Sequence, residues 1–332
     1  MSIRSQTFID HLQLTAIFLL IGFVTAKPFE ALHKRSSQII DAVVDASFAD
    51  PAIFEDADGT FYTFATNHHG NHVQVANATA VNGPWEVLQH DLLPVPGNWS
   101  TGAEVWAPDV RKIGENYILY YSAQNAEQTL QHCVGAATSK TVLGPYEALD
   151  TPLACPLSEG GAIDISGFTD TDGTHFVVYK VDGNSIGHGG ACGNTVEPIV
   201  PTPIRLQRLE DDGYSPAGEP MDILDRIEGD GPYIEAPQII LVDGVYFLFF
   251  SSNCFLTPGY DIKYATASAI RGPYTRSSNQ LLQTDVPFDL IAPGGAQITG
   301  DGKFMVFHAN CDNGRCMYER QLRFSGTNVT VA

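Results

Sequence analysis

Charged residues are scarce in this 332-residue sequence, and basic residues are scarcer still. Only 17% of the chain is charged while 44% is hydrophobic, which excludes an intrinsically disordered protein. Lys and Arg number 18 against 38 Asp and Glu, and the formal charge of -20 makes nucleic acid and anionic membranes unfavourable partners. Glycine (31) and proline (20) are abundant instead, which favours turns and short strands over long helices. We therefore expect an all-β protein that binds neither nucleic acid nor a membrane.

Long apolar runs are absent beyond the N-terminal region, where residues 12–26 read LQLTAIFLLIGFVTA. This run is shorter than the roughly 20 residues that span a bilayer and ends in small residues, so we interpret residues 1–26 as a secretory signal peptide. A dibasic pair at 34–35 indicates a short propeptide over residues 27–35. We expect a secreted, extracellular protein whose residues 36–332 form a single domain.

None of the six cysteines shows the Cys-x-x-Cys or Cys/His spacing of a zinc site. In a secreted chain they predict disulfides, although the sequence leaves most pairings open. Cys311 and Cys316 flank a turn sequence, Asp312-Asn313-Gly314, and we predict that these two pair. Three N-glycosylation sequons predict glycans on exposed loops, at Asn77, Asn98 and Asn328.

One pattern occurs five times: an apolar entry segment, a turn with glycine, and an aromatic-rich strand. The five instances start at Asp50, Trp106, Asp164, Glu235 and Gly294. Each predicts a β-hairpin, and the spacing of roughly 60 residues leaves room for about four short strands per unit. Four-stranded units that repeat radially form a β-propeller, here with five blades. A β-sandwich would not explain the repeat.

Two further segments fit this architecture. The third unit is the longest, and residues 187–204 of it predict a loop over one mouth of the central channel. The alternating segment 38–48 and the terminal segment 322–331 are expected to pair and close the ring.

Three acids share one position in the repeat. Asp50, Asp164 and Glu235 each lie nine residues before the turn glycine of their unit. If the turn is one residue shorter in the other two units, Trp106 and Gly294 hold the equivalent position there. Because innermost strands of a propeller start around one axial cavity, these side chains are expected to converge. A single acid there could simply cap a turn, but three carboxylates in apolar surroundings are costly and indicate function.

Two carboxylates that flank a glycosidic bond suffice for its hydrolysis. Glu235, with the longer reach, is our candidate for the general acid, and Asp50 is the candidate base. The negative charge of Asp164 would hold the proton on Glu235 near neutral pH, which makes Asp164 the pKa modulator.

Four more residues are candidates for the site. Trp106 is expected to stack on a sugar ring, although an indole at this position could also pack in the core. Lys180 and Asn184 are expected near the mouth, where they would pair with an acid or bind a sugar hydroxyl. His308 would lie on the axis below the acids, where it would orient a carboxylate or bind a cation.

Six short motifs in this order resemble glycoside hydrolase family 43, particularly its secreted fungal members. They are ADPAI (49–53), WAPDV (106–110), AIDISGF (162–168), YKVDGN (179–184), IEAPQI (234–239) and GGAQI (294–298). The resemblance implies a five-bladed propeller and an inverting glycosidase that acts on arabinose- or xylose-containing plant cell-wall polysaccharides or oligosaccharides. By motif, Asp50 matches the base, Glu235 the acid and Asp164 the modulator. His308 resembles an axial histidine that in some members binds calcium or sodium through water, and no other cofactor is implied.

Several functions remain open at this point. An arabinan endo- or exo-1,5-α-L-arabinosidase or an α-L-arabinofuranosidase is favoured, and a β-xylosidase of the same fold is the alternative within the family. Retaining fructan enzymes usually have Arg-Asp-Pro around the middle acid, whereas this chain has Ile163-Asp164-Ile165. A carbohydrate-binding propeller without activity would not need three acids. We expect a monomer.

Overall fold

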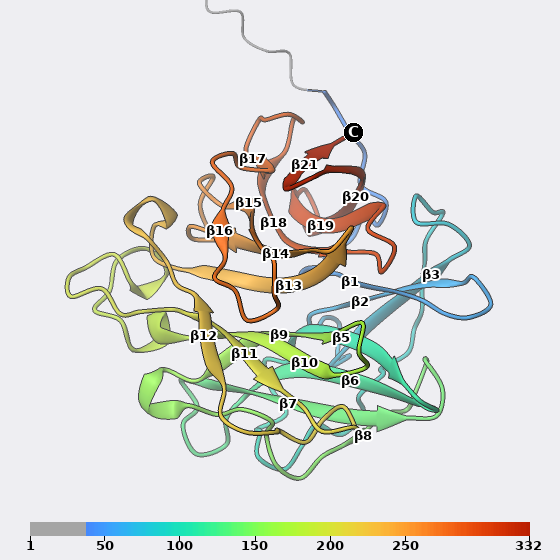
Figure 1. Ribbon diagram of the computed structural model, residues 1–332. Coiled ribbons are helices and arrows are strands. Elements are labelled where there is room, and N and C mark those ends of the chain that lie inside the picture. The colour runs from blue at the N-terminus through green and yellow to red at the C-terminus, as the bar shows by residue number, and fades with distance from the viewer. Residues whose placement is uncertain (1–37) are drawn as a thin grey trace, which may run out of the picture. The chain divides into compact units, whose positions relative to one another are not determined.

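Each of the five predicted hairpins is present and forms the two innermost strands of its own antiparallel sheet. The computed structural model describes residues 38–332, which form a five-bladed β-propeller (Figure 1). This confirms the all-β fold and the five blades. The predicted signal peptide (1–26) and propeptide (27–35) lie outside the described residues.

Every blade is built from one continuous stretch of chain. The first blade contains β1 (Ala52–Glu55), β2 (Phe61–Ala65), β3 (Gln74–Ala78) and β4 (Glu86–Val87). The second contains β5 (Trp106–Ile113), β6 (Asn116–Gln124), β7 (His132–Ser139) and β8 (Glu147–Ala148). The third contains β9 (Ala162–Thr169), β10 (His175–Val181), β11 (Ile204–Arg208) and β12 (Met221–Leu224).

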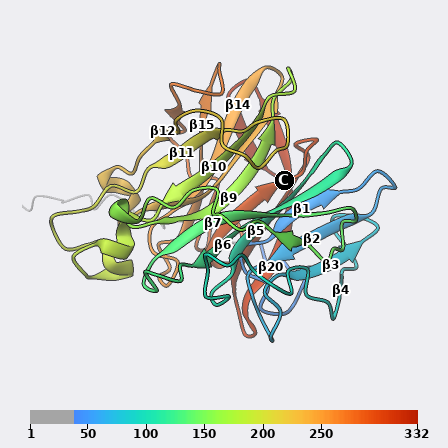
Figure 2. The same cartoon turned by 90° about the horizontal axis from the view of Figure 1, so that it is seen from below.

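The last two blades follow the same order, with one additional strand. The fourth contains β13 (Ile234–Val242), β14 (Val245–Ser252), β15 (Asp261–Ala267), β16 (Thr275–Arg276) and β17 (Leu282–Gln283), which also pairs with β15. The fifth contains β18 (Ile291–Ile298), β19 (Phe304–Cys311), β20 (Gly314–Ser325) and β21 (Asn328–Val331). In Figure 2, seen from below, neighbouring strands of the second and third blades follow one another in chain order.

Helical structure in residues 38–332 is limited to four short 3-10 turns, and none of them is long enough to cross a bilayer. They are η1 (Leu157–Glu159), η2 (Gly183–Ile186), η3 (Ala191–Gly193) and η4 (Glu228–Asp230). Two of them, η2 and η3, lie in the connection from β10 to β11; η3 falls within the predicted insertion of the third blade (187–204), whereas η2 precedes it.

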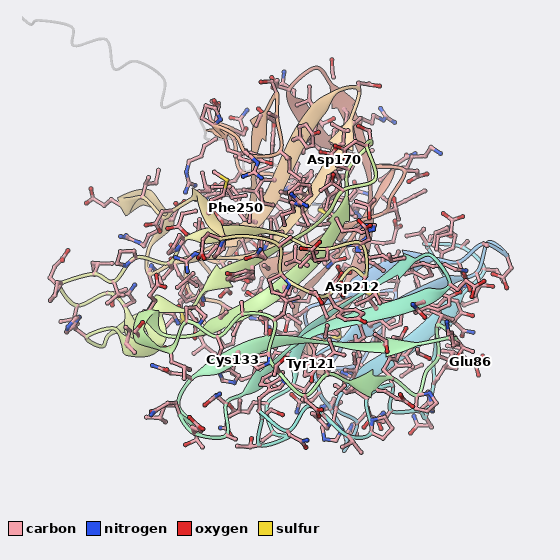
Figure 3. The ribbon with its side chains drawn as sticks, turned by 60° about the horizontal axis from the view of Figure 1, so that its bottom comes forward. Glu86, Tyr121, Cys133, Asp170, Asp212 and Phe250 are labelled. Carbon is pink, nitrogen blue, oxygen red and sulfur yellow. A yellow bond between two sulfur atoms is a disulfide. The ribbon has the colours of Figure 1, made fainter. Side chains whose placement is uncertain are left out.

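Residues 38–332 contain five large hydrophobic clusters, each between two neighbouring blades, and a sixth, small cluster around Tyr233 and Tyr260. Tyr121 of β6 and Phe250 of β14 are fully buried in two of these layers, whereas Glu86 of β4 is exposed at the rim (Figure 3). The innermost strands β1, β5, β9, β13 and β18 contact one another in a closed cycle. Burial of apolar surface therefore holds blade against blade all the way around the axis.

The predicted pairing of segment 38–48 with segment 322–331 is wrong. Residues 322–331 pair with each other, because β20 and β21 form a hairpin in which Leu322 faces Val331. Segment 38–48 instead runs beside the other end of β20, where the N–H groups of Val43 and Val44 donate to Met317 O. It closes the ring by packing, since Val44 is buried in the cluster between the fifth and first blades.

The structure contains three disulfides, Cys133–Cys155, Cys192–Cys254 and Cys311–Cys316, which confirms the predicted last pair. The sequons differ in their environment. Asn98 lies exposed in a loop and Asn328 is exposed at the start of β21. The expected loop position is wrong for Asn77, which is half-buried within β3 between Tyr62 and Glu86.

The innermost strands share a bulge near their starts. In blades two to five the register with the second strand shifts there, and Asp50 takes the same place in the first blade. The first bulge residue has a left-handed backbone in every blade, with φ of 54° at Asp50, 43° at Ala107, 58° at Asp164, 50° at Ala236 and 58° at Gly295. This conformation costs about 1–2 kcal/mol for a residue with a side chain, so something must hold it.

Hydrogen bonds between blades hold these bulges. The N–H of each left-handed residue donates to a side chain of the preceding blade, and we call the five bonds together the axial ring. They run from Asp50 to His308 Nδ1 (3.1 Å), from Ala107 to Thr66 Oγ1 (3.1 Å), from Asp164 to Ser122 Oγ (2.9 Å), from Ala236 to Asp164 Oδ2 (2.9 Å) and from Gly295 to Ser251 Oγ (2.9 Å). The ring thus couples the position of every innermost strand to its neighbour.

Substitution of Ser251 with Ala tests this role. The change leaves the buried N–H of Gly295 without a partner, so we expect the free energy of unfolding to fall by about 1–3 kcal/mol in urea denaturation. Ser278→Ala, at an exposed position, is the matched control and should change it by less than about 0.5 kcal/mol. Equal stability of the two variants would contradict the role of the axial ring.

Candidate active site

The three predicted acids meet at one end of the axis, but they come from two registers rather than one. Asp50 and Asp164 are first bulge residues, whereas in the fourth blade this position is held by Ala236. Glu235 precedes the bulge and pairs with Ser251, as Trp106 pairs with Ser122. The expectation of a single register is therefore wrong for Glu235.

The difference has a physical cause in the hairpin turns. The fourth blade reverses through a two-residue turn at 243–244, whereas the first and third reverse through the longer connections 56–60 and 170–174. Counting back from the turn glycine therefore reaches a different position in the fourth blade.

Asp50 is held as an anion. Its Oδ2 accepts a hydrogen bond from Thr66 Oγ1 at 2.6 Å, and its Oδ1 lies 3.1 Å from Nη1 of Arg315. Burial raises the pKa of Asp50, but the Arg315 guanidinium and the Thr66 hydroxyl outweigh it and hold the pKa below its usual range. A carboxylate that stays ionised is suited to accept a proton.

Asp164 behaves in the opposite way. Burial, followed by the negative charge of Glu235, raises the pKa of Asp164 to about 8, although Lys180 opposes the shift. Its Oδ2 also accepts the N–H of Ala236, the residue after Glu235. Asp164 therefore retains its proton at neutral pH, and it lies next to Glu235.

Glu235 is almost fully buried and is fixed by two donors. Lys180 Nζ donates to its Oε2 at 3.0 Å, and the Tyr260 hydroxyl donates to its Oε1 at 2.7 Å. Lys180 occupies the position where three of the other blades carry Ser122, Ser251 or His308, but an ammonium cannot accept a hydrogen bond. Asp164 accepts the Ala236 N–H in its place. Lys180 therefore takes no part in the axial ring, and its ammonium pairs with Glu235 and Asp182 instead.

A cavity of about 440 Å³ lies beside Glu235 and has walls from blades two, three and four. It brings together the predicted residues Trp106, Lys180 and Asn184. Asn184 Oδ1 is buried without a hydrogen-bond partner in the described structure and is therefore available to a hydroxyl group. A cavity of this size, with an indole and convergent polar groups, fits a small polar ligand such as a sugar.

Trp106 does not face the cavity alone. The ring of His132 stacks on the indole at a centroid distance of 4.0 Å, and His132 Nε2 lies 3.1 Å from Oε2 of Glu104. His132 and Glu104 line the same cavity as Trp106, although neither of these two was predicted as a site residue. Nothing in their sequence positions distinguishes them from ordinary strand and loop residues.

Asp50 and Asp164 line a second cavity on the axis, of about 30 Å³, which is large enough to hold a water molecule. His308 lies against it, beside Gly295. Burial and the charge of Arg315 lower the pKa of His308 to about 3, so the ring is neutral. Because its Nδ1 accepts the N–H of Asp50, the proton resides on Nε2, which is buried and has no partner among residues 38–332. This arrangement fits a water molecule, and it fits a cation only through such a water.

Two residues that contact the acids were missed by sequence reasoning. Arg315 lies just after the turn between Cys311 and Cys316 and pairs with Asn310, two residues from His308 on the neighbouring strand. This position in the hairpin was a signal that could have placed Arg315 near the axis. Tyr260 lies in an irregular loop after β14, where the repeat pattern gives no register.

Comparison with known proteins places this arrangement in a family. The model of the glycosyl hydrolases family 43 matches residues 39–329. This chain belongs to glycosyl hydrolase family 43. The resemblance of its motifs to that family is thereby confirmed.

The relatives found include enzymes from Aspergillus. A probable arabinan endo-1,5-α-L-arabinosidase A from Aspergillus oryzae is 39% identical over 97 residues, which are 28% of this chain and 28% of that protein. The β-D-galactofuranosidase xynD of Aspergillus niger is 27% identical over 225 residues, which are 63% of this chain and 58% of that protein. Both matches thus span less than two thirds of the relative's length.

Among solved structures, a thermostable family 43 glycoside hydrolase superimposes with a TM-score of 0.73 at 24% identity, covering 86% of this chain and 92% of that one. This likeness supports the propeller fold of the family 43 chain.

The opposite pKa shifts of Asp50 and Asp164 predict the pH dependence of hydrolysis. Asp50 must be ionised, and because its pKa is lowered, activity is lost only as the pH falls below the usual range of an aspartate carboxyl. The proton retained by Asp164 must be present, so activity is lost as the pH rises through about 8. Asp164→Asn removes the carboxyl group with the raised pKa, so we expect the alkaline limb of kcat/KM to move to lower pH. An unmoved alkaline limb in this variant would contradict this role of Asp164.

Proposed function

We propose that this family 43 chain is an extracellular inverting glycosidase that hydrolyses furanosidic bonds of arabinose-containing plant polysaccharides or oligosaccharides. The observation that carries the proposal is the opposed environment of its carboxylates. Asp50 is stabilised as an anion by Arg315, whereas Asp164 retains a proton beside Glu235. An inverting glycosidase needs one carboxylate of each kind.

The roles follow from the positions of the groups. Of Asp164 and Glu235, only Glu235 lines the 440 Å³ cavity, so it delivers the proton that Asp164 retains to the leaving oxygen as the glycosidic C–O bond breaks. Asp50 removes a proton from a water as the water oxygen bonds to the anomeric carbon. Asp164 keeps the proton available to Glu235, because its own pKa lies near 8.

The remaining site residues would bind the sugar. Trp106, backed by His132, offers an aromatic face. Asn184 Oδ1 is an unpartnered acceptor, and Lys180 orients Glu235 through their ion pair. If calcium or sodium binds, His308 would hold it through a water, and its charge would favour the ionised form of the nearby carboxylates.

The substrate class rests on the relatives. One is named an arabinan endo-1,5-α-L-arabinosidase and another a β-D-galactofuranosidase. An α-L-arabinofuranoside and a β-D-galactofuranoside share the stereochemistry of the five-membered ring and differ in one carbon outside it. A β-D-galactofuranoside is therefore the second candidate substrate, ahead of the β-xyloside.

The disulfides support the extracellular location, because bonds of this kind persist in oxidising compartments.

Product analysis tests the proposal. Purified protein is incubated with linear α-1,5-arabinan, arabinoxylan, xylo-oligosaccharides and nitrophenyl furanosides, and we expect release of arabinose or short arabino-oligosaccharides, whose length distinguishes exo from endo action. Glu235→Gln should lower the rate by about 10²- to 10⁴-fold, because the proton donor is lost.

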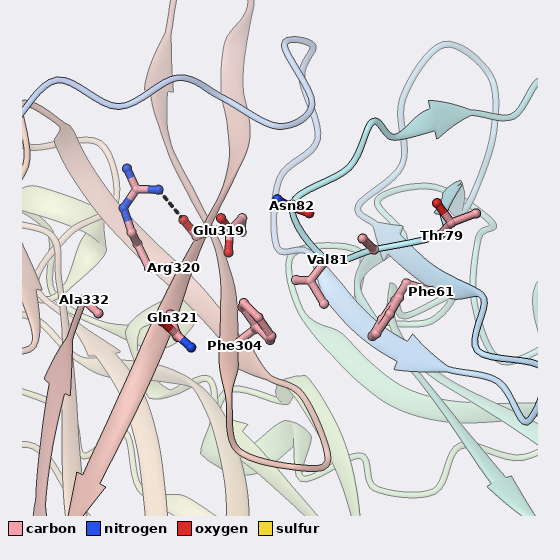
Figure 4. Close-up of a pocket in the computed structure, with 10 residues that line it drawn as sticks. Phe61, Thr79, Val81, Asn82, Phe304, Glu319, Arg320, Gln321 and Ala332 are labelled. Carbon is pink, nitrogen blue, oxygen red and sulfur yellow. Dashed lines mark hydrogen bonds between the residues drawn. The ribbon is translucent and has the colours of Figure 1, made fainter.

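Glu319→Gln is the matched control. Glu319 is a half-buried glutamate that lines a separate cavity of about 410 Å³ between the first and fifth blades, with Phe61 and Phe304 (Figure 4). The proposed function would be wrong if wild type released no sugar from any of these substrates, or if both glutamate variants retained the wild-type rate.

A further inference from the structure

We propose that the loop 253–260, tethered by the Cys192–Cys254 disulfide, is the element that positions both catalytic carboxylates. Phe255 and Tyr260 are the positioning residues of this loop. The roles of the carboxylates rest on the proposed function, whereas the contacts themselves do not.

The disulfide joins two blades at the cavity wall. Cys192 belongs to η3 in the insertion of the third blade, and Cys254 follows β14 of the fourth. Tyr233 reinforces the junction, because its hydroxyl donates to Cys192 Sγ at 3.2 Å and accepts the N–H of Phe255 at 3.1 Å. The start of the loop is thus fixed covalently and through a buried tyrosine.

One branch leads from the loop to Asp50. The guanidinium of Arg315 lies 5.1 Å from the centre of the Phe255 ring, within the range of a cation–π contact. Nη1 of the same guanidinium is the group that binds Asp50 Oδ1. Phe255 therefore fixes the plane and position of the cation that keeps Asp50 ionised.

The other branch leads to Glu235. The Tyr260 hydroxyl at the end of the loop donates to Glu235 Oε1. The Tyr233 ring supports the opposite donor, since Lys180 Nζ lies 4.0 Å from its centroid while it binds Glu235 Oε2. One oxygen of Glu235 is therefore oriented by the loop itself, and the other by Lys180, which packs on the same Tyr233 ring that anchors the loop.

Tyr260 also explains why the fifth blade has a glycine, Gly294, at the position where the fourth blade carries Glu235. A Cβ at Gly294 would collide with the Tyr260 ring, so glycine is required for blade five to pack on it. The Tyr260 ring also stacks near His308, at a centroid distance of 6.0 Å. The loop is consequently held at one end by the disulfide and at the other by blade five.

Release of the loop should appear first in the titration of Asp50. The titratable and charged groups that face Asp50 are Arg315 of β20, His308 of β19, Asp164 of β9 and Tyr260 of the loop. Only Arg315 favours the anion by its full charge, because His308 is neutral. Weakening the Arg315 contact must therefore raise the pH at which Asp50 takes up a proton.

The experiment compares pH profiles of kcat/KM for Phe255→Ala and for Cys192→Ser/Cys254→Ser. We expect both to move the acid limb upward by about half a pH unit and to lower kcat/KM by about 3- to 10-fold at the optimum. The triple variant should show little further change, because both changes act through one contact. Phe255→Tyr keeps the ring and should restore the wild-type profile.

The matched control is Cys133→Ser/Cys155→Ser, which removes another disulfide but leaves the loop 253–260 tethered. It should leave the acid limb in place. An acid limb that moves equally in this control, or that stays in place in Phe255→Ala and in the Cys192/Cys254 variant, would overturn the proposal.

Titration of the Asp50 carboxyl carbon by 13C NMR makes this test independent of turnover. If wild type hydrolyses no substrate, the proposed function fails, while the shift of the Asp50 titration in Phe255→Ala still decides the positioning role. If wild type is active and the titration is unchanged in Phe255→Ala, the positioning role fails and the proposed function stands.

Discussion

The axial ring is the constraint on which the rest of the structure depends. Four of the five left-handed bulge residues have side chains and would each raise the free energy of the fold, and hydrogen bonds from the preceding blade hold all five. Two of these positions are Asp50 and Asp164, so the device that joins the blades also directs two carboxylates to the axis. At the one step where a lysine replaces the acceptor, the freed ammonium binds Glu235, and the site is built around that exception.

The sequence repeat was sufficient to predict the five blades, because an aromatic strand after a glycine turn specifies one hairpin wherever it occurs. It also predicted that one end of the axis contains Asp50, Asp164, Glu235, Trp106 and His308. It could not place Glu235 in its true register, since turn length differs between blades. Arg315 and the Cys192–Cys254 pair depend on contacts between blades, which no local pattern reports.

The acids of the site differ in their charged neighbours. In this chain with a net charge of -20, three acids lie around the axis, and the cations Arg315 and Lys180 contact two of them. Arg315 binds Asp50 directly, so that group stays ionised. Asp164 is desolvated by burial and faces Glu235 instead of a contacting cation, so Asp164 retains a proton. Different partners thus give similar carboxyl groups opposite tasks.

The central claim is that Asp50 activates water while Glu235 protonates the leaving group, and the anomeric configuration of the first product tests it most directly. Proton NMR of the first minutes of hydrolysis of an α-L-arabinofuranoside would show which anomer forms before mutarotation. The account predicts the β anomer, because water attacks from the face opposite the leaving group. Initial formation of the α anomer would mean that a carboxylate attacks the sugar, and it would contradict these roles.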